Sequence, residues 1–426
     1  MSPHHHLQLE IERHTLANGL RVVLHPDRRW PLVAVNLWYH VGSKNERPGR
    51  TGFAHLFEHM LFQGSEHVGT NDHFHQVQQV GGVANGSTWY DRTNYYETLP
   101  AHCLDLGLWL ESDRMGYLLP AMTAEKLETQ RQVVMNERRQ RIDNQPYGRA
   151  LERMNELLFP APHPYHWPVI GYMEDIAAAT LEEVADFFRT WYAPNNAVLT
   201  VAGDVDPRQA LERIEHWFGD LPAGPAPPEI SPQLPPLGGE QRAVLSDDVR
   251  LPRIYLGFRA PRYGEDGWYA ADLLATIWAT GKSSTLYREL VYHRQMAQDV
   301  SSWVLPTEEA ALLGVIATAR PGVDVAELEK ALLAELEAFT EREPAAEEME
   351  RARNRLLTDH FNDLQKLDRR ADLLSQHATF FDDPFLAPAE PSRYEELSPA
   401  DVLDTARRIL RPGQRAMVVV VPAETA

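Results

Sequence analysis

The stretch TLEEVADFFRTWYAPNNAVLTVAGDVD, residues 180–206, decides the fold that we predict. Thr180 and Glu183 form a capping box, a pairing that marks the start of a helix. The apolar run that begins at Ala197 follows this helix and predicts a strand. This order, a capped helix and then an apolar strand, recurs near the C-terminus.

The second copy of this order is SPADV, residues 398–402, followed by the apolar run AMVVVVPAE from Ala416. Ser398 is the predicted N-cap of its helix. Thr180 and Ser398 are 218 positions apart, and Val198 and Ala416 are separated by the same interval. Two copies of one α/β domain explain this constant offset better than chance.

Predicted strands and helices alternate within each half. The turn at Asn18-Gly19 indicates a hairpin, and an alternating strand follows at about 33–40. Helices are expected at about 51–63, 70–81, 102–118 and 123–142. Hairpin signals mixed with long helices predict an α+β fold of two homologous domains, each a mixed or antiparallel β-sheet covered on one face by helices.

A Pro-rich stretch, PAGPAPPEISPQLPPLGG, divides the chain near its middle. This composition resists both helix and sheet and is typical of an extended linker. We therefore predict an N-terminal domain at 1–221, a linker at 222–242 and a homologous C-terminal domain at 243–426.

Composition narrows the classes of protein to which the chain can belong. Of its 426 residues 43% are hydrophobic and 24% are charged, which is typical of a folded globular protein. The net charge of −20 argues against nucleic acid as a partner, and the lone Cys103 cannot form an internal disulfide. No apolar run is long enough to span a membrane, and residues 1–6 lack the apolar part of a signal peptide. The expected compartment is the cytoplasm, or the periplasm if a signal peptide has been removed. The triple His at 4–6 is not among the candidate site residues.

Residues 51–62, TGFAHLFEHMLF, are predicted to form an apolar helix that carries three polar side chains. Thr51 is expected to cap its start. Because the helix is apolar nearly all round, we expect it to be buried. The Glu58 carboxylate, buried beside the imidazoles of His55 and His59, is costly unless a partner such as a divalent metal satisfies it.

The spacing of these residues favours a metal site. His55 and His59 are four residues apart, so they share a helix face with their Cβ atoms about 5–6 Å apart, as two ligands of one ion require. Glu58 is close enough to hydrogen-bond water held at that ion. This spacing is the inverzincin motif, and the chain contains no HExxH. The alternative is a helix with ordinary polar residues, because such a string arises by chance roughly one time in ten.

A catalytic zinc site usually has a third protein ligand. The best candidate is Glu137, which follows the apolar pair Val133-Val134 on the helix LETQRQVVMNERRQRIDNQPYG. Glu125 and Glu128 belong to more exposed turns. From periodicity alone, a solvated helix carboxylate remains the favoured interpretation of Glu137. The pairs His73/His75 and His163/His166 are predicted to be structural.

HLFEH, followed about 75 residues later by QRQVVMNERRQRIDN, resembles the pitrilysin/insulinase family of zinc peptidases. The resemblance is to its short two-domain branch, which includes the mitochondrial processing peptidases. It covers essentially the whole chain and extends to TLANGLRVVLHPD, HPYHWPVIGYMEDI and YAPNNAVLTVAGDVD. The resemblance implies that Glu137 completes the zinc site. It also implies an auxiliary acid seven residues earlier, where this chain has Gln130, which can still hydrogen-bond in the second shell.

The resemblance also implies a substrate strand. In the family, the strand that matches residues 84–88 pairs with the extended peptide, which assigns Ala84, Asn85, Gly86 and Ser87 to substrate binding. The residues alone are equally compatible with an interior strand in which Asn85-Gly86 makes a turn.

The resemblance further implies a partner chain. In the short branch, two subunits enclose a cavity, and an Arg and a Tyr of a C-terminal domain grip the substrate carbonyl. The matching segment is KSSTLYRELVYHRQMAQDV, in which Val291 and Gln298 occupy those two positions. We therefore expect a dimer with a related subunit that supplies the Arg and the Tyr. A register that is off by one turn, or a homodimer that uses Tyr292, remains the alternative.

Together these features predict a zinc-dependent endopeptidase that cleaves short or unfolded polypeptides inside a chamber formed by two subunits. Zn²⁺ would be held by His55, His59 and Glu137, and Glu58 would act as the general base. The alternatives are a non-catalytic structural subunit and a zinc-dependent peptide-binding scaffold of the same family. Structural members of the family typically have degraded motifs, whereas all four residues are present here.

Overall fold

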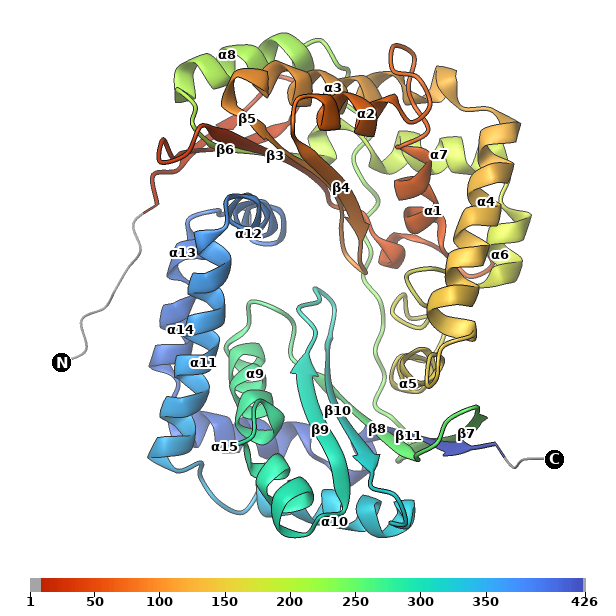
Figure 1. Cartoon of the computed structure of the whole chain (residues 1–426), viewed down its shortest axis with the longest axis vertical. Helices are drawn as coiled ribbons and strands as arrows, with labels where there is room; N and C mark the ends of the chain where they lie inside the picture. The colour runs from red at the N-terminus through yellow and green to blue at the C-terminus, as the bar shows by residue number, and fades with distance from the viewer. Residues whose placement is uncertain (1–8, 424–426) are drawn as a thin grey trace. The chain divides into compact units, whose positions relative to one another are not determined.

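The computed structural model describes residues 9–423, so the triple His at 4–6 lies outside the described residues. The chain forms two compact units, each built around one β-sheet (Figure 1). The first unit consists of the described residues up to Asn136, Pro168–Ile230 and Phe361–Glu390. The second consists of Glu137–Trp167, Ser231–His360 and the described residues from Pro391.

The sheet of the first unit has six strands in the order β1-β2-β6-β3-β5-β4. Only β2 and β6 are parallel, and the other neighbours are antiparallel. The central strand β6 is buried along its whole length, which explains its unbroken apolar sequence. The strands are β1 (Glu12–Thr15), β2 (Arg21–Pro26), β3 (Leu32–Tyr39), β4 (Val83–Thr88), β5 (Thr93–Pro100) and β6 (Ala197–Gly203).

The sheet of the second unit repeats this arrangement without a counterpart of β1. Its order is β7-β11-β8-β10-β9, and again only one pair of neighbours, here β7 and β11, is parallel. The predicted internal duplication and the α+β class are therefore confirmed. The strands are β7 (Gln241–Asp247), β8 (Arg253–Ala260), β9 (Ala297–Val304), β10 (Ala311–Ala319) and β11 (Arg415–Pro422).

Helices from the N-terminal half cover one face of the first sheet. They are α1 (Phe53–Met60), α2 (Asp72–Gln79), α3 (Leu104–Ala121) and α8 (Pro207–Phe218). The other face of this sheet packs against α12 (Leu367–Phe380), where Ala371, Leu374 and Ala378 contact Trp38, Val198 and Ala202 (Figure 1). The prediction of a sheet covered on one face only is thus wrong for the first unit, because its second cover comes from the distant end of the chain.

The second sheet is covered in the reciprocal way. On it pack α9 (Asp266–Ala279), α10 (Val325–Ala338), α15 (Pro399–Ile409) and, from the N-terminal half, α5 (Ala150–Leu158). Gly257 of β8 allows α5 to approach closely, because a Cβ there would lie 2.7 Å from atoms of Met154 and Leu158. In sequence α5 follows α4 (Ala124–Arg138) as α12 follows α11 (Ala346–Gln365), so each repeat contributes the equivalent helix to the sheet of the other.

The two helix starts that reveal the repeat have the predicted capping boxes. Thr180 and Glu183 open α7 (Leu181–Trp191), and Ser398 and Asp401 open α15. Between α8 and β7, the described chain forms neither helix nor strand, in keeping with an extended Pro-rich segment. The boundaries at 222–242 remain a prediction. The remaining helices are α6 (Met173–Ala178), α13 (Leu386–Ala389) and α14 (Pro391–Glu396), with π-helical segments at Arg139–Asp143 and Tyr287–His293.

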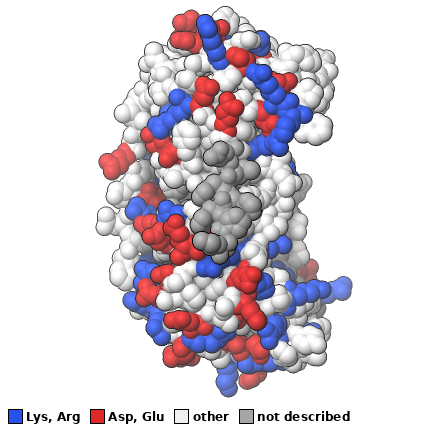
Figure 2. Space-filling view, turned by 90° about the vertical axis from the view of Figure 1, so that its left-hand side faces the viewer, with Lys and Arg blue, Asp and Glu red and all other residues white. Residues whose placement is uncertain are grey.

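The surface carries charges of both signs. On the face seen in Figure 2, Lys and Arg side chains lie among Asp and Glu side chains despite the net charge of −20. Among the helices of residues 9–423, none combines the length and the apolar character needed to cross a bilayer.

Candidate metal centre and substrate strand

Helix α1 presents three polar side chains on one side and apolar side chains on the others. Phe53, Ala54, Leu56, Phe57 and Met60 are buried, as expected for an apolar helix. His55, Glu58 and His59 are only partly buried, because their spacing places them together on the remaining face. The imidazole rings of His55 and His59 lie with their centroids 4.8 Å apart.

The start of α1 is held by carboxylates from other segments. The N-cap residue is Gly52 in the left-handed region at φ 82°, and no side chain of that residue caps the helix, so the prediction that Thr51 is the cap is wrong. Glu46 accepts hydrogen bonds from the backbone N–H groups of Gly52 and Ala54, both at 2.8 Å. The Thr51 hydroxyl instead donates to Asp175 at 2.7 Å. The partly buried Glu46 and Asp175 therefore fix the helix that carries the histidines.

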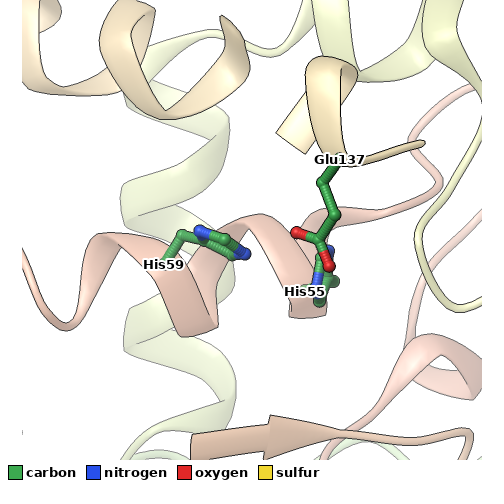
Figure 3. A group of neighbouring side chains, drawn as sticks. All are labelled: His55, His59 and Glu137. Atoms are coloured by element: carbon green, nitrogen blue, oxygen red, sulfur yellow. The ribbon is translucent and has the colours of Figure 1, made fainter. Parts of the chain in front are cut away.

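Glu137 lies in the last turn of α4, and its carboxylate points toward the His55 imidazole (Figure 3). One ligand atom from each of His55, His59 and Glu137 lies within 4.8 Å of the others. The division between the two units falls inside α4, after Asn136, so Glu137 is joined to the first unit by continuous helix. Glu125 and Glu128 are exposed on earlier turns of α4, as predicted.

The donor set of this cluster fits zinc. Two neutral imidazoles and one carboxylate are a ligand set used by catalytic zinc, which keeps a further position for water. The three ligand atoms are close enough to converge on one ion with little movement. Glu58 is not part of this group; its Oε2 accepts a hydrogen bond from the Thr88 hydroxyl at 2.6 Å.

Two neighbours of Glu137 on its helix bear on the site. Arg141, whose side chain is 75% exposed, forms an ion pair with the Glu137 carboxylate at 2.7 Å. The Glu137 side chain is only 16% exposed, but the exposed Arg141 is held by solvent as well as by Glu137, so we expect the pair to be a small obstacle to metal binding. Gln130, two turns before Glu137, is buried. Of the apolar pair between them, Val134 is buried and Val133 is exposed. The predicted buried stripe therefore runs through Gln130 and Val134.

The predicted substrate strand β4 is the outer strand of its sheet. Asn85 and Gly86 lie within the strand, opposite Tyr96 and Tyr95, so the alternative in which they form a turn is wrong. A Cβ at Gly86 would lie 3.1 Å from the rings of Phe62, two residues beyond the end of α1, and Tyr95 of β5. The outer edge of β4 has no strand paired with it among the described residues. Ala84, Asn85, Gly86 and Ser87 thus lie where an extended peptide could add to the sheet.

The Ser87 side chain belongs to a polar network. Its hydroxyl donates to Asn94 Oδ1 at 2.7 Å, and Arg92 donates to the Ser87 carbonyl at 2.8 Å. Asn94 in turn donates to Asp372 of α12 at 3.1 Å. The shape of β4 is therefore tied to the helix that the C-terminal half contributes.

A second group of metal-ligating side chains comes together in the described part of the chain: His73, Glu97 and Glu111. All three are buried, and Arg114 forms ion pairs with both carboxylates, which places a cation there already. Burial raises the pKa of Glu97 and Glu111 and lowers that of His73 to about 3. His73 donates to Glu97 at 3.0 Å as a neutral imidazole, which agrees with its predicted structural role.

His163 and His166 also have structural surroundings. His163 is buried against Phe159, with ring centroids 5.0 Å apart, and its Nδ1 accepts a hydrogen bond from the Tyr165 backbone N–H at 3.1 Å. Burial lowers the pKa of His163 to about 4. His166 Nδ1 lies 2.8 Å from the Phe159 carbonyl oxygen, to which it can donate.

The segment expected to carry a substrate-gripping Arg and Tyr lies in the second unit. Val291 is buried in the π-helical segment Tyr287–His293, and Gln298 is exposed on β9. Tyr292 is 72% exposed, and Arg294 forms an ion pair with Glu335.

Comparisons with known proteins agree with this geometry. Residues 21–159 match the family model described as Insulinase (Peptidase family M16), and residues 178–356 match the model described as Peptidase M16 inactive domain. The chain is 30% identical to a Helicobacter pylori protein named zinc protease PqqE, over 98% of this chain and 95% of that protein. The chain belongs to peptidase family M16.

Other M16 relatives extend this result. A Mycobacterium leprae protein named an uncharacterized zinc protease is 31% identical over 73% of this M16 chain and 69% of that protein. The crystal structure of a protease from Helicobacter pylori superposes with a TM-score of 0.91 at 29% identity, covering 97% of this chain and all of that one. A Pseudomonas fluorescens structure described as a peptidase M16 inactive domain shares the fold, with a TM-score of 0.88 at 17% identity.

Sequence reasoning missed three groups around the M16 site. Glu46 lies in a loop six residues before Gly52, the N-cap of the helix, and Arg141 is one turn beyond Glu137. Thr88 ends the predicted substrate strand, but nothing in the sequence indicates that its hydroxyl reaches Glu58. The contact becomes apparent only in the structure, where β4 lies next to α1.

Proposed function

We propose that this M16 chain is a zinc-dependent endopeptidase whose metal is held by His55, His59 and Glu137. The observation that carries the proposal is the convergence of these three side chains beside Glu58, a carboxylate outside the ligand group. A structural metal site would have no use for a fourth, partly exposed carboxylate on the same helix face. The names of the zinc protease relatives support the same metal.

Each chain residue has a separate task in this proposal. When bound, Zn²⁺ polarises the scissile carbonyl and acidifies water. His55 and His59 would bind the ion through imidazoles that lie on one face of α1. Glu137, at the end of α4, would bind it through its negatively charged carboxylate. Glu58 accepts the proton of the attacking water and passes it to the leaving amine, so its carboxylate must be ionised and correctly oriented.

The substrate class follows from the edge strand. An extended peptide that adds to β4 forms main-chain hydrogen bonds whatever its sequence, with Ala84, Asn85, Gly86 and Ser87 as its partners. A folded protein cannot offer a free strand at this edge. We therefore propose short or unfolded polypeptides as substrates.

The test compares metal content with turnover. His55→Ala and His59→Ala should each lose the one zinc expected per chain, measured by atomic absorption. Glu58→Gln should keep that zinc and lower turnover of a mixed peptide library by roughly 10²- to 10⁴-fold, because it removes the proton acceptor. Full activity of Glu58→Gln contradicts the mechanism. Zinc and peptide binding without turnover in the unmodified chain would favour the non-catalytic scaffold instead.

We also propose that a related subunit completes the active site within a two-subunit chamber. Support comes from the second unit, where a buried Val291 and an exposed Gln298 stand at the positions of the expected Arg and Tyr. Valine has no hydrogen-bond donor, and the glutamine amide cannot replace a tyrosine phenol, so neither side chain can take over the expected role of the Arg and the Tyr. The purified chain alone should hydrolyse peptides slowly, and addition of a related chain that has the Arg and Tyr but lacks HLFEH should restore the rate. Full activity of the lone chain contradicts this proposal.

A further inference from the structure

The two ends of the Thr88–Glu58 hydrogen bond belong to different parts of the proposed site. Thr88 is the last residue of the substrate strand β4, and Glu58 is the proposed base on α1. The Thr88 hydroxyl is a donor to Glu58 Oε2 at 2.6 Å, a short distance typical of a hydroxyl bonded to a carboxylate. Because one carboxylate oxygen is held in this way, the other oxygen has a defined direction.

The strand orients Thr88 toward α1 through the alternation of its side chains. Gly86 faces Phe62, which lies two residues beyond the end of α1, so Thr88, two residues on, points to the same face. Ser87 points to the opposite face, where it bonds Asn94. Neighbouring hydroxyls on β4 thus have different partners, and only that of Thr88 reaches the base.

The segments that carry Thr88 and Glu58 are both anchored by the same neighbouring stretch of chain. The hairpin tip after Thr88 is fixed by hydrogen bonds from Ser43 N–H to the Trp89 carbonyl and from Lys44 N–H to the Tyr90 carbonyl, at 3.1 and 2.8 Å. A buried ion pair between Lys44 and Asp91 at 3.2 Å adds to this anchor.

The same short segment leads directly into the residue that caps α1. Lys44 is two residues before Glu46, whose carboxylate accepts hydrogen bonds from the start of that helix. The substrate strand and the helix that carries Glu58 are therefore held by one stretch of chain. This arrangement fixes the distance between Thr88 and Glu58 before any peptide arrives.

We propose that Thr88 is a positioning residue that orients the Glu58 carboxylate for proton transfer and couples that base to the strand on which the substrate lies. The proposal rests on the endopeptidase function proposed above. Thr88 is not a member of the ligand group of His55, His59 and Glu137, so we expect its role to lie in the orientation of Glu58 and to leave metal binding unchanged. A carboxylate fixed in this way need not reorient during the reaction, which favours the chemical step.

The first test separates kcat from KM in zinc-loaded enzyme. Thr88→Val has the same shape and lacks the hydroxyl, so kcat should fall by about 10- to 100-fold, the scale for loss of a hydrogen bond to a charged group. KM should stay within about threefold, and zinc content should be unchanged. Thr88→Ser restores the donor and should recover most of kcat. An unchanged kcat in Thr88→Val overturns the proposal.

A double-mutant cycle asks whether Thr88 acts through Glu58. In a Glu58→Gln background, Thr88→Val should leave both the residual turnover and the affinity for a fixed peptide unchanged, because the base is already absent. Ser87→Ala is the matched control: it perturbs the same strand from the other face, so its effect on peptide affinity should persist in that background. Equal losses from Thr88→Val in both backgrounds would assign Thr88 to strand shape alone and overturn the proposal.

The crystal structure of each zinc-loaded variant gives a readout that does not depend on activity. Glu58 should keep one side-chain conformation in the unmodified chain and in Thr88→Ser, and adopt another or several in Thr88→Val. An identical Glu58 conformation in all three overturns the positioning role. Failure of the endopeptidase function itself would appear elsewhere, as full activity of Glu58→Gln.

Discussion

Single residues at the candidate site are defined by their spacing on one helix. His55, Glu58 and His59 are three and four residues apart, and this spacing gathers them on the one face of α1 that is not packed in the core. Glu58 then differs from its neighbours in accepting a hydrogen bond from the Thr88 hydroxyl. The residue types and their spacing therefore indicate the candidate metal site. The contacts that each side chain makes indicate its proposed role.

His163 shows how burial of one titratable side chain affects stability. Its Nδ1 accepts from Tyr165 N–H, so protonation would replace an acceptor by a second donor. The folded pKa of about 4 lies below the ordinary value of about 6.5, so the unfolded chain takes up the proton first as pH falls. The stabilisation is complete above about pH 6.5 and is lost progressively down to about pH 4.

We predict that His163→Asn will weaken this dependence. The asparagine Oδ1 can take the place of Nδ1 as acceptor and does not titrate. Between pH 7 and pH 5 the unmodified chain should lose on the order of 1–2 kcal/mol of unfolding free energy more than His163→Asn, measured by urea unfolding. Between pH 7 and pH 8 the two should change alike. An equal loss in both proteins on acidification would show that His163 is not the titrating group.

At the scale of elements, the sequence predicts where helices and strands lie better than how they are anchored. The period of α1 and the capping boxes of α7 and α15 are local patterns, and the structure has them where they were expected. The cap of α1 is a carboxylate from a preceding loop, Glu46, and no local pattern links a loop acid to a helix start. The edge position of β4 depends on sheet order, which local pattern does not contain.

Helix α4 provides a prediction of its own. Gln130 occupies the position two turns before Glu137 where the family pattern has an acid, and its side chain is 6% exposed. Gln130→Glu should keep or raise kcat/KM, because it restores the expected acid on the face that carries Glu137. Gln132→Glu is the control: it adds the same charge on an exposed face and should leave zinc affinity unchanged. If Gln130→Glu abolishes zinc binding, the alignment of this helix is wrong.

At the scale of the whole molecule, the main departure from expectation is the reciprocal exchange of α5 and α12. The linker and the repeat predict two domains, each formed by one continuous half of the chain. The family resemblance does not indicate which helix packs on which sheet. Each compact unit nevertheless contains a segment from the other half of the chain. The exchange could not be predicted, because the amphipathic sequences of α5 and α12 indicate that each helix buries one face but not which sheet covers that face.

This exchange predicts the behaviour of a nicked molecule. A protease site placed within 226–233, where the chain forms neither helix nor strand, should be cut without loss of structure. The two fragments should elute together in size-exclusion chromatography, since each unit is built from both of them, and should separate only in denaturant. The uncut insertion variant is the control for the insertion itself. Fragments that separate under native conditions would contradict the exchanged arrangement.

The exchange also has a consequence for synthesis on the ribosome. A nascent chain emerges from its N-terminus, so the six strands of the first sheet are available long before residues 361–390 leave the exit tunnel. Until α12 arrives, Trp38, Val198 and Ala202 lack the side chains that bury them in the finished protein. The apolar face of the N-terminal sheet is thus buried only after α12 has been translated, and until then an elongating ribosome carries an apolar surface that a chaperone could shield.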